Sequence, residues 1–127
     1  MTYKLNILKP SVNNLTVRIF IRAADLEAEE TDVWGSTTGP EYLAKYPIHL
    51  TPTLEDPDLP RGTLGESCAI MAYLCNKHGL DRFYPTDPGE RAKALLAEGL
   101  SRKDVAHRLA EETGISRNTA YRLVSEL

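Results

Sequence analysis

The chain has 127 residues, of which 42% are hydrophobic and 26% charged, a composition typical of a globular protein with one core and room for a small appendage. No apolar run approaches the ~20 residues that a membrane span needs, and no basic-then-apolar leader opens the chain, so we expect a cytoplasmic protein. The net charge of −3 is uneven: residues 1–88 hold 8 Lys and Arg against 12 Asp and Glu, and residues 89–127 hold 7 against 6. Neither part has the strongly basic character of a typical nucleic-acid-binding domain.

The first 80 residues carry signals for alternating strands and helices. Polar and apolar side chains alternate over residues 3–8, which is typical of a strand, and the almost wholly apolar run over residues 15–24 indicates a largely buried helix. The remaining expected elements are a strand over 29–33, a helix over 40–45, a strand from residue 51, a strand at 63–64 and a helix over 66–78. The order β-α-β-α-β-β-α predicts an α/β domain of the thioredoxin-like type, a single sheet with helices on either side.

Both cysteines fall in the last of these helices. Cys68 and Cys75 are seven residues apart, without a Cys-x-x-Cys pair or a spacing typical of metal ligands. Because the stretch around them is strongly apolar, we expect two buried free thiols, no disulfide and no metal site.

Three short motifs in this part of the chain occur in a characteristic order and spacing. Ser11 follows the first expected strand, residues 50–54 are Leu-Thr-Pro-Thr-Leu, and residues 66–70 are Glu-Ser-Cys-Ala-Ile. Through these motifs, residues 3–92 resemble the N-terminal domain of glutathione transferases, which place a catalytic Ser, Tyr or Cys after the first strand and carry similar Val-Pro-x-Leu and Glu-Ser-x-Ala-Ile motifs. The resemblance implies a site for glutathione.

The resemblance also implies a role for each matching residue. Ser11 would be the catalytic residue, donating a hydrogen bond that lowers the pKa of the glutathione thiol at a helix N-terminus that favours anions. A cis proline at Pro52 would turn the Thr51 backbone toward the cysteinyl amide of the tripeptide. Ser67 and the neighbouring N–H groups would hold the γ-glutamyl carboxylate, while Glu66 would bind the γ-glutamyl ammonium group.

Simpler interpretations remain open for several of these residues. Ser11 and Ser67 can serve only as helix caps, where Ser is favoured, and Pro52 can be a turn device without a ligand. The chain also departs from the family, because His-Leu at residues 49–50 stands where Gly-Lys or Gly-Gln is usual, which removes a common contact to glutathione. Asn14, close behind Ser11, is an alternative donor to the thiol. We therefore expect weak affinity for glutathione.

The character of the sequence changes after residue 85. Asp87-Pro88-Gly89-Glu90 is a strong helix start, and further helices are expected from Ser101 to about residue 112 and over residues 117–126. The stretch at residues 95–106, Leu-Leu-Ala-Glu-Gly-Leu-Ser-Arg-Lys-Asp-Val-Ala, resembles the helical tail of bacterial small-subunit ribosomal RNA ribose methyltransferases. We therefore expect a helical unit of different origin after the first domain.

Two domains follow from these resemblances. Residues 1–86 would be the thioredoxin-like domain, and residues 87–127 would be a three-helix unit in place of the all-helical domain that continues glutathione transferases. The meeting of two unrelated families at one short boundary suggests an engineered chimera, with a natural fusion or a truncated gene product as the alternatives. The oligomeric state stays open between monomer and homodimer.

The last two helices also fit a helix-turn-helix pattern, which raises nucleic-acid binding as a rival function. Arg117, Asn118 and Arg122 would lie on the outer face of the final helix, and Arg and Asn are residue types that contact bases. The net charge of this unit and its nearby glutamates argue against phosphate attraction, so three helices that merely pack together are the favoured interpretation.

A unit of about 40 residues without disulfide or metal rarely supports its own core. We expect its apolar residues to dock on the apolar helix faces of the first domain: Leu95, Leu96, Leu100, Val105, Leu109 and Leu123. The expected function is then a chimeric, mainly architectural protein with a vestigial glutathione site and little activity. An active glutathione transferase or glutathione-dependent reductase is the alternative.

Overall fold

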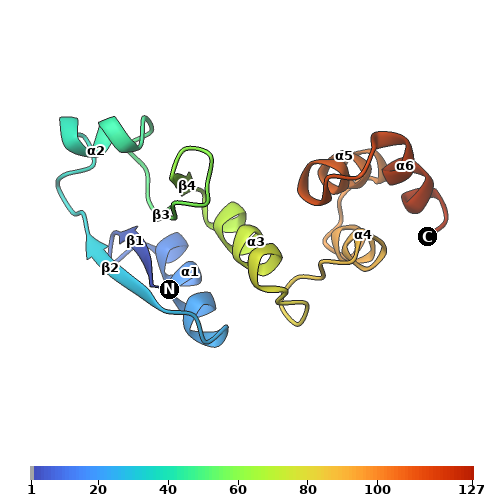
Figure 1. Ribbon diagram of the computed structural model, residues 1–127, viewed down its shortest axis with the longest axis horizontal. Helices are drawn as coiled ribbons and strands as arrows, with labels where there is room; N and C mark the ends of the chain where they lie inside the picture. Colours follow the sequence, from blue (N-terminus) through green and yellow to red (C-terminus); the bar gives the residue numbers. More distant parts are fainter. Residues whose placement is uncertain (1) are drawn as a thin grey trace. The chain divides into compact units, whose positions relative to one another are not determined.

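The computed structural model describes residues 2–127, and Figure 1 labels their helices and strands along the chain. The elements are β1 (Tyr3–Ile7), α1 (Val12–Ala23), β2 (Ala28–Asp32), α2 (Pro40–Lys45), β3 (Thr53–Glu55), β4 (Thr63–Gly65), α3 (Ser67–His78), α4 (Pro88–Ala97), α5 (Arg102–Thr113) and α6 (Arg117–Ser125). The first seven confirm the predicted β-α-β-α-β-β-α order. Contacts between Cα atoms divide the chain into two compact units, Met1–Tyr73 and Leu74–Leu127, a division that falls inside α3. The domain boundary at residues 86–87 stays a prediction.

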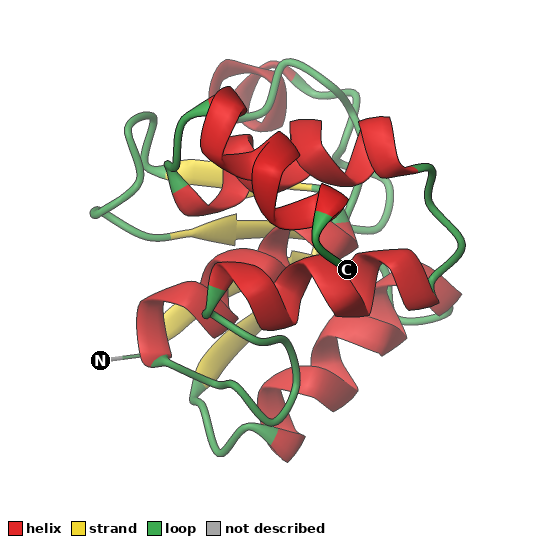
Figure 2. Ribbon diagram, turned by 90° about the vertical axis from the view of Figure 1, so that its right-hand side faces the viewer, coloured by secondary structure: helices red, strands yellow, loops and turns green. Residues whose placement is uncertain are grey.

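The strands, yellow in Figure 2, form one four-stranded sheet in the order β2-β1-β3-β4. β1 pairs with β2 in parallel, with Leu5 opposite Glu30, because the helix α1 crosses over between them. β1 and β3 are antiparallel, with Leu5 opposite Leu54, and β3 and β4 form an antiparallel hairpin. This mixed sheet confirms the predicted thioredoxin-like fold.

The period-two alternation of β1 gives the sheet two chemically different faces. Tyr3, Leu5 and Ile7 are buried on one face, where they form part of the core of the first unit. Asn6 lies on the other face, where its side-chain amide donates to the Tyr46 hydroxyl at 2.7 Å, just beyond α2. α2 therefore packs over the polar face of the sheet.

Helix α1 is amphipathic, so the prediction of a largely buried helix is wrong for the face that points away from the core. Its buried positions are Asn14, Val17, Phe20 and Ile21, at the 3–4 residue spacing of one helix face. On the opposite side Val12 is 75% exposed and Ile19 is 58% exposed. A run of apolar residues alone does not specify which side of a helix meets the sheet.

The helices of the second unit begin at side-chain caps, as their sequence predicts. The Asp87 carboxylate accepts a hydrogen bond from the Glu90 N–H at 3.0 Å, and the Ser101 hydroxyl accepts from the Asp104 N–H at 3.1 Å. The Ser116 hydroxyl caps α6 in the same way. Between α5 and α6, Gly114 adopts a left-handed φ of 73°, which ends α5 and turns the chain.

The apolar residues of α4, α5 and α6 form a core inside the helical unit, and Figure 1 shows the three helices gathered together. The fully buried members of this cluster are Ala92, Leu95, Val105, Ala106, Leu109, Ala120 and Val124, with Leu96, Leu100 and Leu123 packed against them. The leucines therefore contact one another within the helical unit, and their docking on the first domain stays a prediction. Each of the three helices contributes a buried alanine to this core, namely Ala92, Ala106 and Ala120.

A fully buried arginine completes this unit. Arg91 donates through Nε to the Pro85 carbonyl at 2.6 Å, and its guanidinium lies over the Tyr84 ring at 3.9 Å from the centroid. Glu112 accepts from the Tyr84 hydroxyl at 3.0 Å and also pairs with Arg108. Burial and the nearby Glu112 carboxylate raise the pKa of Tyr84 to about 12, so this phenol stays protonated and keeps donating.

The cysteines differ in their surroundings. Both are free, as expected, but Cys68 is exposed and only Cys75 is buried, so the prediction of two buried thiols is wrong for Cys68. Burial raises the pKa of the Cys75 thiol. Within residues 2–127, no helix is long and apolar enough to cross a membrane.

Candidate functional site

The N-terminus of α1 is built around the backbone of Ser11. The Ser11 carbonyl accepts from the Leu15 N–H at 3.0 Å, and the Ser11 N–H donates to the Leu8 carbonyl at 3.0 Å. Ser11 therefore holds the N-cap position, yet its hydroxyl makes no capping hydrogen bond. Ser11 is half-buried, and the interpretation of its hydroxyl as a helix cap has no support from a hydrogen bond.

Asn14 lies in the first turn of the same helix and is completely buried. Its Oδ1 accepts from the Leu8 N–H at 2.9 Å, which ties the end of β1 to the start of α1. Its Nδ2 has no hydrogen-bond partner among the described residues. A role as donor to a thiol stays a prediction, and the structure gives Asn14 a structural role through Oδ1.

A groove of about 740 Å³ lies beside the N-termini of α1 and α3. It is lined by Asn13, Ala44, Lys45, Tyr46, Pro47, Ile48, Leu50, Thr51, Pro52, Thr53, Arg61, Thr63, Gly65 and Glu66. Three of the predicted site residues, Thr51, Pro52 and Glu66, therefore meet in one groove. Ser11, Asn14 and Ser67 do not line it, although Asn13 and Glu66 are their chain neighbours.

Thr51 and Pro52 form the wall of the groove that leads into β3. The peptide bond between them is cis. Among the residues that the structure describes, no hydrogen bond of the Thr51 backbone is formed with another part of the chain. Its N–H and carbonyl can therefore pair with an extended peptide, as an added strand would.

Glu66 has an unusual backbone conformation at the opposite wall. Its φ is 71°, in the left-handed region that costs a residue with a Cβ about 1–2 kcal/mol. The Glu66 carbonyl accepts from the Ile70 N–H at 2.9 Å and so begins α3, while the Glu66 side chain is exposed. Such strain persists where the surrounding structure enforces it, and it is concentrated at ligand sites.

The first turn of α3 adds a positive potential to this wall. The N–H groups of its first residues, Ser67, Cys68 and Ala69, have no partner inside the helix, as in any helix N-terminus. Together with the helix dipole they favour a carboxylate or a thiolate. The groove can therefore bind a peptide-like ligand that carries negative charge.

A profile of the glutathione S-transferase N-terminal domain family matches residues 11–91, well over half of the chain. The chain belongs to this family. The match contains every residue of the groove and reaches the fourth residue of α4. No curated protein sequence matches the chain significantly.

Solved glutathione transferases share the fold. A glutathione transferase from Bombyx mori is 34% identical, with a TM-score of 0.65 over 72% of this chain and 44% of its own. A glutathione transferase homologue from Drosophila mojavensis, solved with bound glutathione, is 30% identical, with a TM-score of 0.62 over 84% of this chain and 47% of its own. Glutathione transferase E6 from Drosophila melanogaster is 38% identical, with a TM-score of 0.58 over 71% and 41%. The chain spans less than half the length of these transferases.

Arg61 is a groove residue of this family member that the sequence did not reveal. It lies in the loop between β3 and β4, which is closed by hydrogen bonds from the Asp56 N–H to the Gly62 carbonyl and from the Gly62 N–H to the Leu59 carbonyl. The loop is rich in Pro and Asp. Closure of the loop places Arg61, a positively charged residue, in the lining of the groove.

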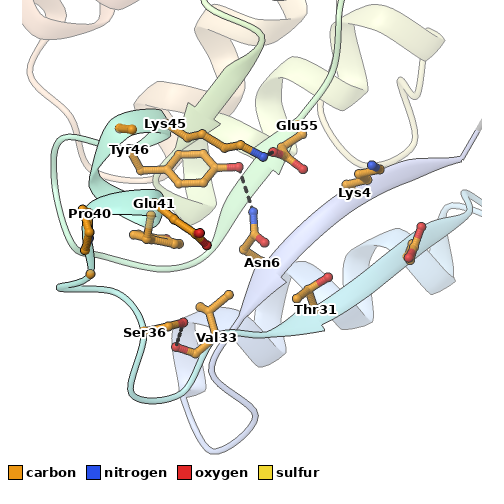
Figure 3. A pocket seen from close by; sticks show the side chains of 14 residues that line it. Lys4, Asn6, Thr31, Val33, Ser36, Pro40, Glu41, Lys45, Tyr46 and Glu55 are labelled. Atoms are coloured by element: carbon orange, nitrogen blue, oxygen red, sulfur yellow. Dashed lines mark hydrogen bonds and ion pairs between the residues drawn. The ribbon is translucent and has the colours of Figure 1, made fainter.

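A second hollow of about 920 Å³ lies between α2 and the polar face of the sheet, and Figure 3 shows its lining. Lys45 pairs with Glu55 at 3.1 Å, and the Asn6 amide donates to the Tyr46 hydroxyl. Burial raises the pKa of that phenol above its usual range. Acidic and basic side chains both line this hollow, and none of the predicted glutathione-binding residues does. The hollow shares Ala44, Lys45 and Tyr46 with the candidate groove.

The three residues predicted to contact nucleic acid lie on α6 of the helical unit. Arg117, Asn118 and Arg122 are all exposed, as predicted. Arg117 lines a pocket that it shares with residues of α5, and Asn118 and Arg122 do not line that pocket. Contact of the three residues with nucleic acid stays a prediction.

Proposed function

We propose that the groove binds glutathione and that the chain serves transferase chemistry on the glutathione thiol. The observation that carries the proposal is the strained backbone of Glu66. Glu66 lines the groove and is one of the residues predicted to contact the ligand. Family membership supports it, as does the bound glutathione of the Drosophila mojavensis homologue.

The chemistry of the groove suggests where each part of the tripeptide binds. The γ-glutamyl carboxylate lies at the N-terminus of α3 beside Ser67, and Glu66 pairs with the γ-glutamyl ammonium group. The cysteinyl backbone pairs with the open N–H and carbonyl of Thr51. Arg61 supplies a cation for the carboxylate at the glycine end of the tripeptide.

Ser11 acts on the sulfur in this proposal. Its hydroxyl donates a hydrogen bond to the thiolate at the N-terminus of α1, which lowers the thiol pKa and keeps the nucleophile ionised. With an activated aryl chloride as the electrophile, the sulfur forms a C–S bond to the ring, the C–Cl bond breaks, and chloride leaves with the bonding electrons. The thiol proton passes to solvent before attack.

We infer weak affinity and a composite origin for the chain. The His-Leu pair at residues 49–50 offers no amine or amide in place of the usual Lys or Gln, which supports weak binding. Residues 95–106 resemble the tail of a different family, which supports a separate source for residues 87–127. The architectural role expected for a chimera rests on the same observation.

The reductase alternative has less support than transferase chemistry. A glutathione-dependent reductase of this fold needs a thiol at the catalytic position. The position at which the family places its catalytic residue holds Ser11 and not a cysteine.

Calorimetric titration with glutathione tests binding, and conjugation to an activated aryl chloride tests chemistry. We expect saturable heat at millimolar ligand for the wild type and for Ser11→Ala, because Ser11 acts on the sulfur and not on the peptide groups. We expect the conjugation rate to fall about 100-fold in Ser11→Ala. Absence of heat at millimolar glutathione would refute the binding proposal, and equal conjugation rates in the two proteins would refute the role of Ser11.

A further inference from the structure

The helical unit carries a pocket of its own, unrelated to glutathione. It measures about 290 Å³ and is lined by Lys103, Asp104 and His107 of α5 and by Arg117 and Tyr121 of α6. This volume is at the lower limit of small-molecule sites, about the size of one nucleotide or a comparable fragment.

Helix periodicity explains why these side chains meet. Lys103 and His107 are four residues apart on α5, and Arg117 and Tyr121 are four residues apart on α6, so each pair lies on one helix face. The opposite faces bury Val105 and Ala120 in the core of the unit. Packing of the core therefore fixes the two outward faces beside each other.

The pocket has more positive than negative charge, because Lys103 and Arg117 line it with one carboxylate, that of Asp104. Neither Lys103 nor Arg117 forms an ion pair or a side-chain hydrogen bond within residues 2–127. The Asp104 carboxylate accepts a hydrogen bond from the Ser101 hydroxyl at 2.6 Å, which holds it against the start of its own helix. The His107 Nε2 atom lies 3.2 Å from the Glu111 carboxylate. Lys103 and Arg117 line the same pocket, and both are available to pair with an anionic group.

Tyr121 gives the pocket a flat apolar surface next to these cations. The side chain is 48% exposed, which is a large exposure for an aromatic residue in a helix whose other apolar residues are packed. Exposed aromatic rings beside basic side chains are the usual platform on which a nucleobase stacks.

We propose that this pocket binds a nucleotide, with its phosphate between Lys103 and Arg117 and its base against Tyr121. The nucleotide can be free or part of a single strand, because both present the same phosphate and base. A duplex fits less well, because its bases are not available to stack on Tyr121 and the unit has too little net positive charge to hold its backbone. Of the residues predicted from the sequence, the geometry selects Arg117 and leaves Asn118 and Arg122 outside the pocket.

Fluorescence anisotropy of the full chain with a short labelled single-stranded RNA tests the proposal. At low salt we expect Arg117→Gln and Tyr121→Ala each to weaken binding about tenfold. Arg122→Gln is the matched control, since Arg122 is an exposed arginine of the same helix that does not line the pocket, and we expect it to bind like the wild type. The slope of log affinity against log salt should decrease by about 0.7 in Arg117→Gln, the value for one lost phosphate contact.

Competition identifies the source of the nucleotide. Displacement of the RNA by adenosine monophosphate indicates that free nucleotides bind, whereas a pocket-dependent RNA complex that resists it indicates a strand ligand. Equal loss of binding in Arg122→Gln and Arg117→Gln would overturn the pocket, and so would the absence of RNA binding at low salt. The stacking role of Tyr121 would be overturned if inorganic phosphate displaced the RNA as effectively as the nucleotide does and Tyr121→Ala bound the RNA like the wild type. None of these results depends on glutathione.

Discussion

The backbone of Glu66 offers the sharpest perturbation of the proposed glutathione site. At a φ of 71°, a residue with a Cβ pays about 1–2 kcal/mol, and glycine avoids this cost. Glycine in turn loses about 0.5–1 kcal/mol of conformational entropy on folding. Glu66→Gly should therefore be about 0.5–1 kcal/mol more stable than Glu66→Ala, which keeps the Cβ and removes the same carboxylate.

Both substitutions should weaken glutathione binding by the same factor. The Glu66 side chain is exposed, so its pairing with the ligand ammonium group is weaker than a buried charge-assisted hydrogen bond. We expect its loss to cost about 1.4 kcal/mol of binding free energy, which is tenfold in affinity. The expected signature is thus increased stability with reduced binding in Glu66→Gly, and reduced binding alone in Glu66→Ala. Asp25→Gly is the control, because Asp25 also has a positive φ, of 55°, and lies outside the groove.

Amide exchange and calorimetry measure the two effects separately. Exchange at the Leu54 amide, at the centre of β3, reports opening of the sheet next to the groove without assuming that the chain unfolds in one step. Slower exchange is expected in Glu66→Gly than in Glu66→Ala, and unchanged glutathione affinity in Asp25→Gly. Equal exchange in the two Glu66 variants would refute the strain argument, and unaltered affinity would remove Glu66 from the site.

Three further predictions concern stability. Leu109→Ala should cost about 3–4 kcal/mol by leaving a cavity in the core of the helical unit, and faster amide exchange in α4, α5 and α6 measures it; a cost below 1 kcal/mol would show a loosely packed core. Ser116→Ala should destabilise α6 by about 1 kcal/mol through loss of its cap, seen as faster exchange of the α6 amides, while Ser125→Ala, at the other end of the helix, should not. The hydrogen bond from Arg18 lowers the pKa of Glu30, so this pair should stabilise the first unit above the ordinary glutamate pKa and cease to do so as acid protonates Glu30. The urea midpoint of the wild type should therefore decrease below pH 5, and this decrease should be smaller in Glu30→Gln. An equal acid dependence in the two proteins would contradict the pairing.

Local signals explain why the elements were predictable. The alternation at β1 and the apolar run at α1 give direct evidence of strand and helix, and the caps at Asp87 and Ser101 mark helix starts within one residue. Which helix face is buried depends on the sheet and not on the run itself, so the exposure of Ile19 was not foreseen. The places of Ala92 and Ala106 in the core of the helical unit were not predicted for the same reason, since small residues appear ordinary in sequence.

The site was only partly predictable because its residues are distant in sequence. Thr51 and Glu66 were identified through family motifs, and the fold brings them into one groove. The left-handed conformation of Glu66 has no sequence signal, because positive φ is usually carried by glycine. Arg61 escaped notice because its place in the groove depends on how the loop after β3 closes, and Tyr121 escaped notice because its pocket requires the packing of α5 against α6.

The central claim is that the groove between Thr51 and Glu66 holds glutathione. Titration of the isotopically labelled full chain with glutathione, followed by amide chemical shifts, tests it at each position. We expect saturable shifts at Thr51, Arg61, Glu66 and Ser67, with the amides of the helical unit core, such as Leu109, unmoved. Shifts that appear elsewhere and leave the Thr51 and Ser67 amides unchanged, or no shifts at millimolar glutathione, would contradict the account.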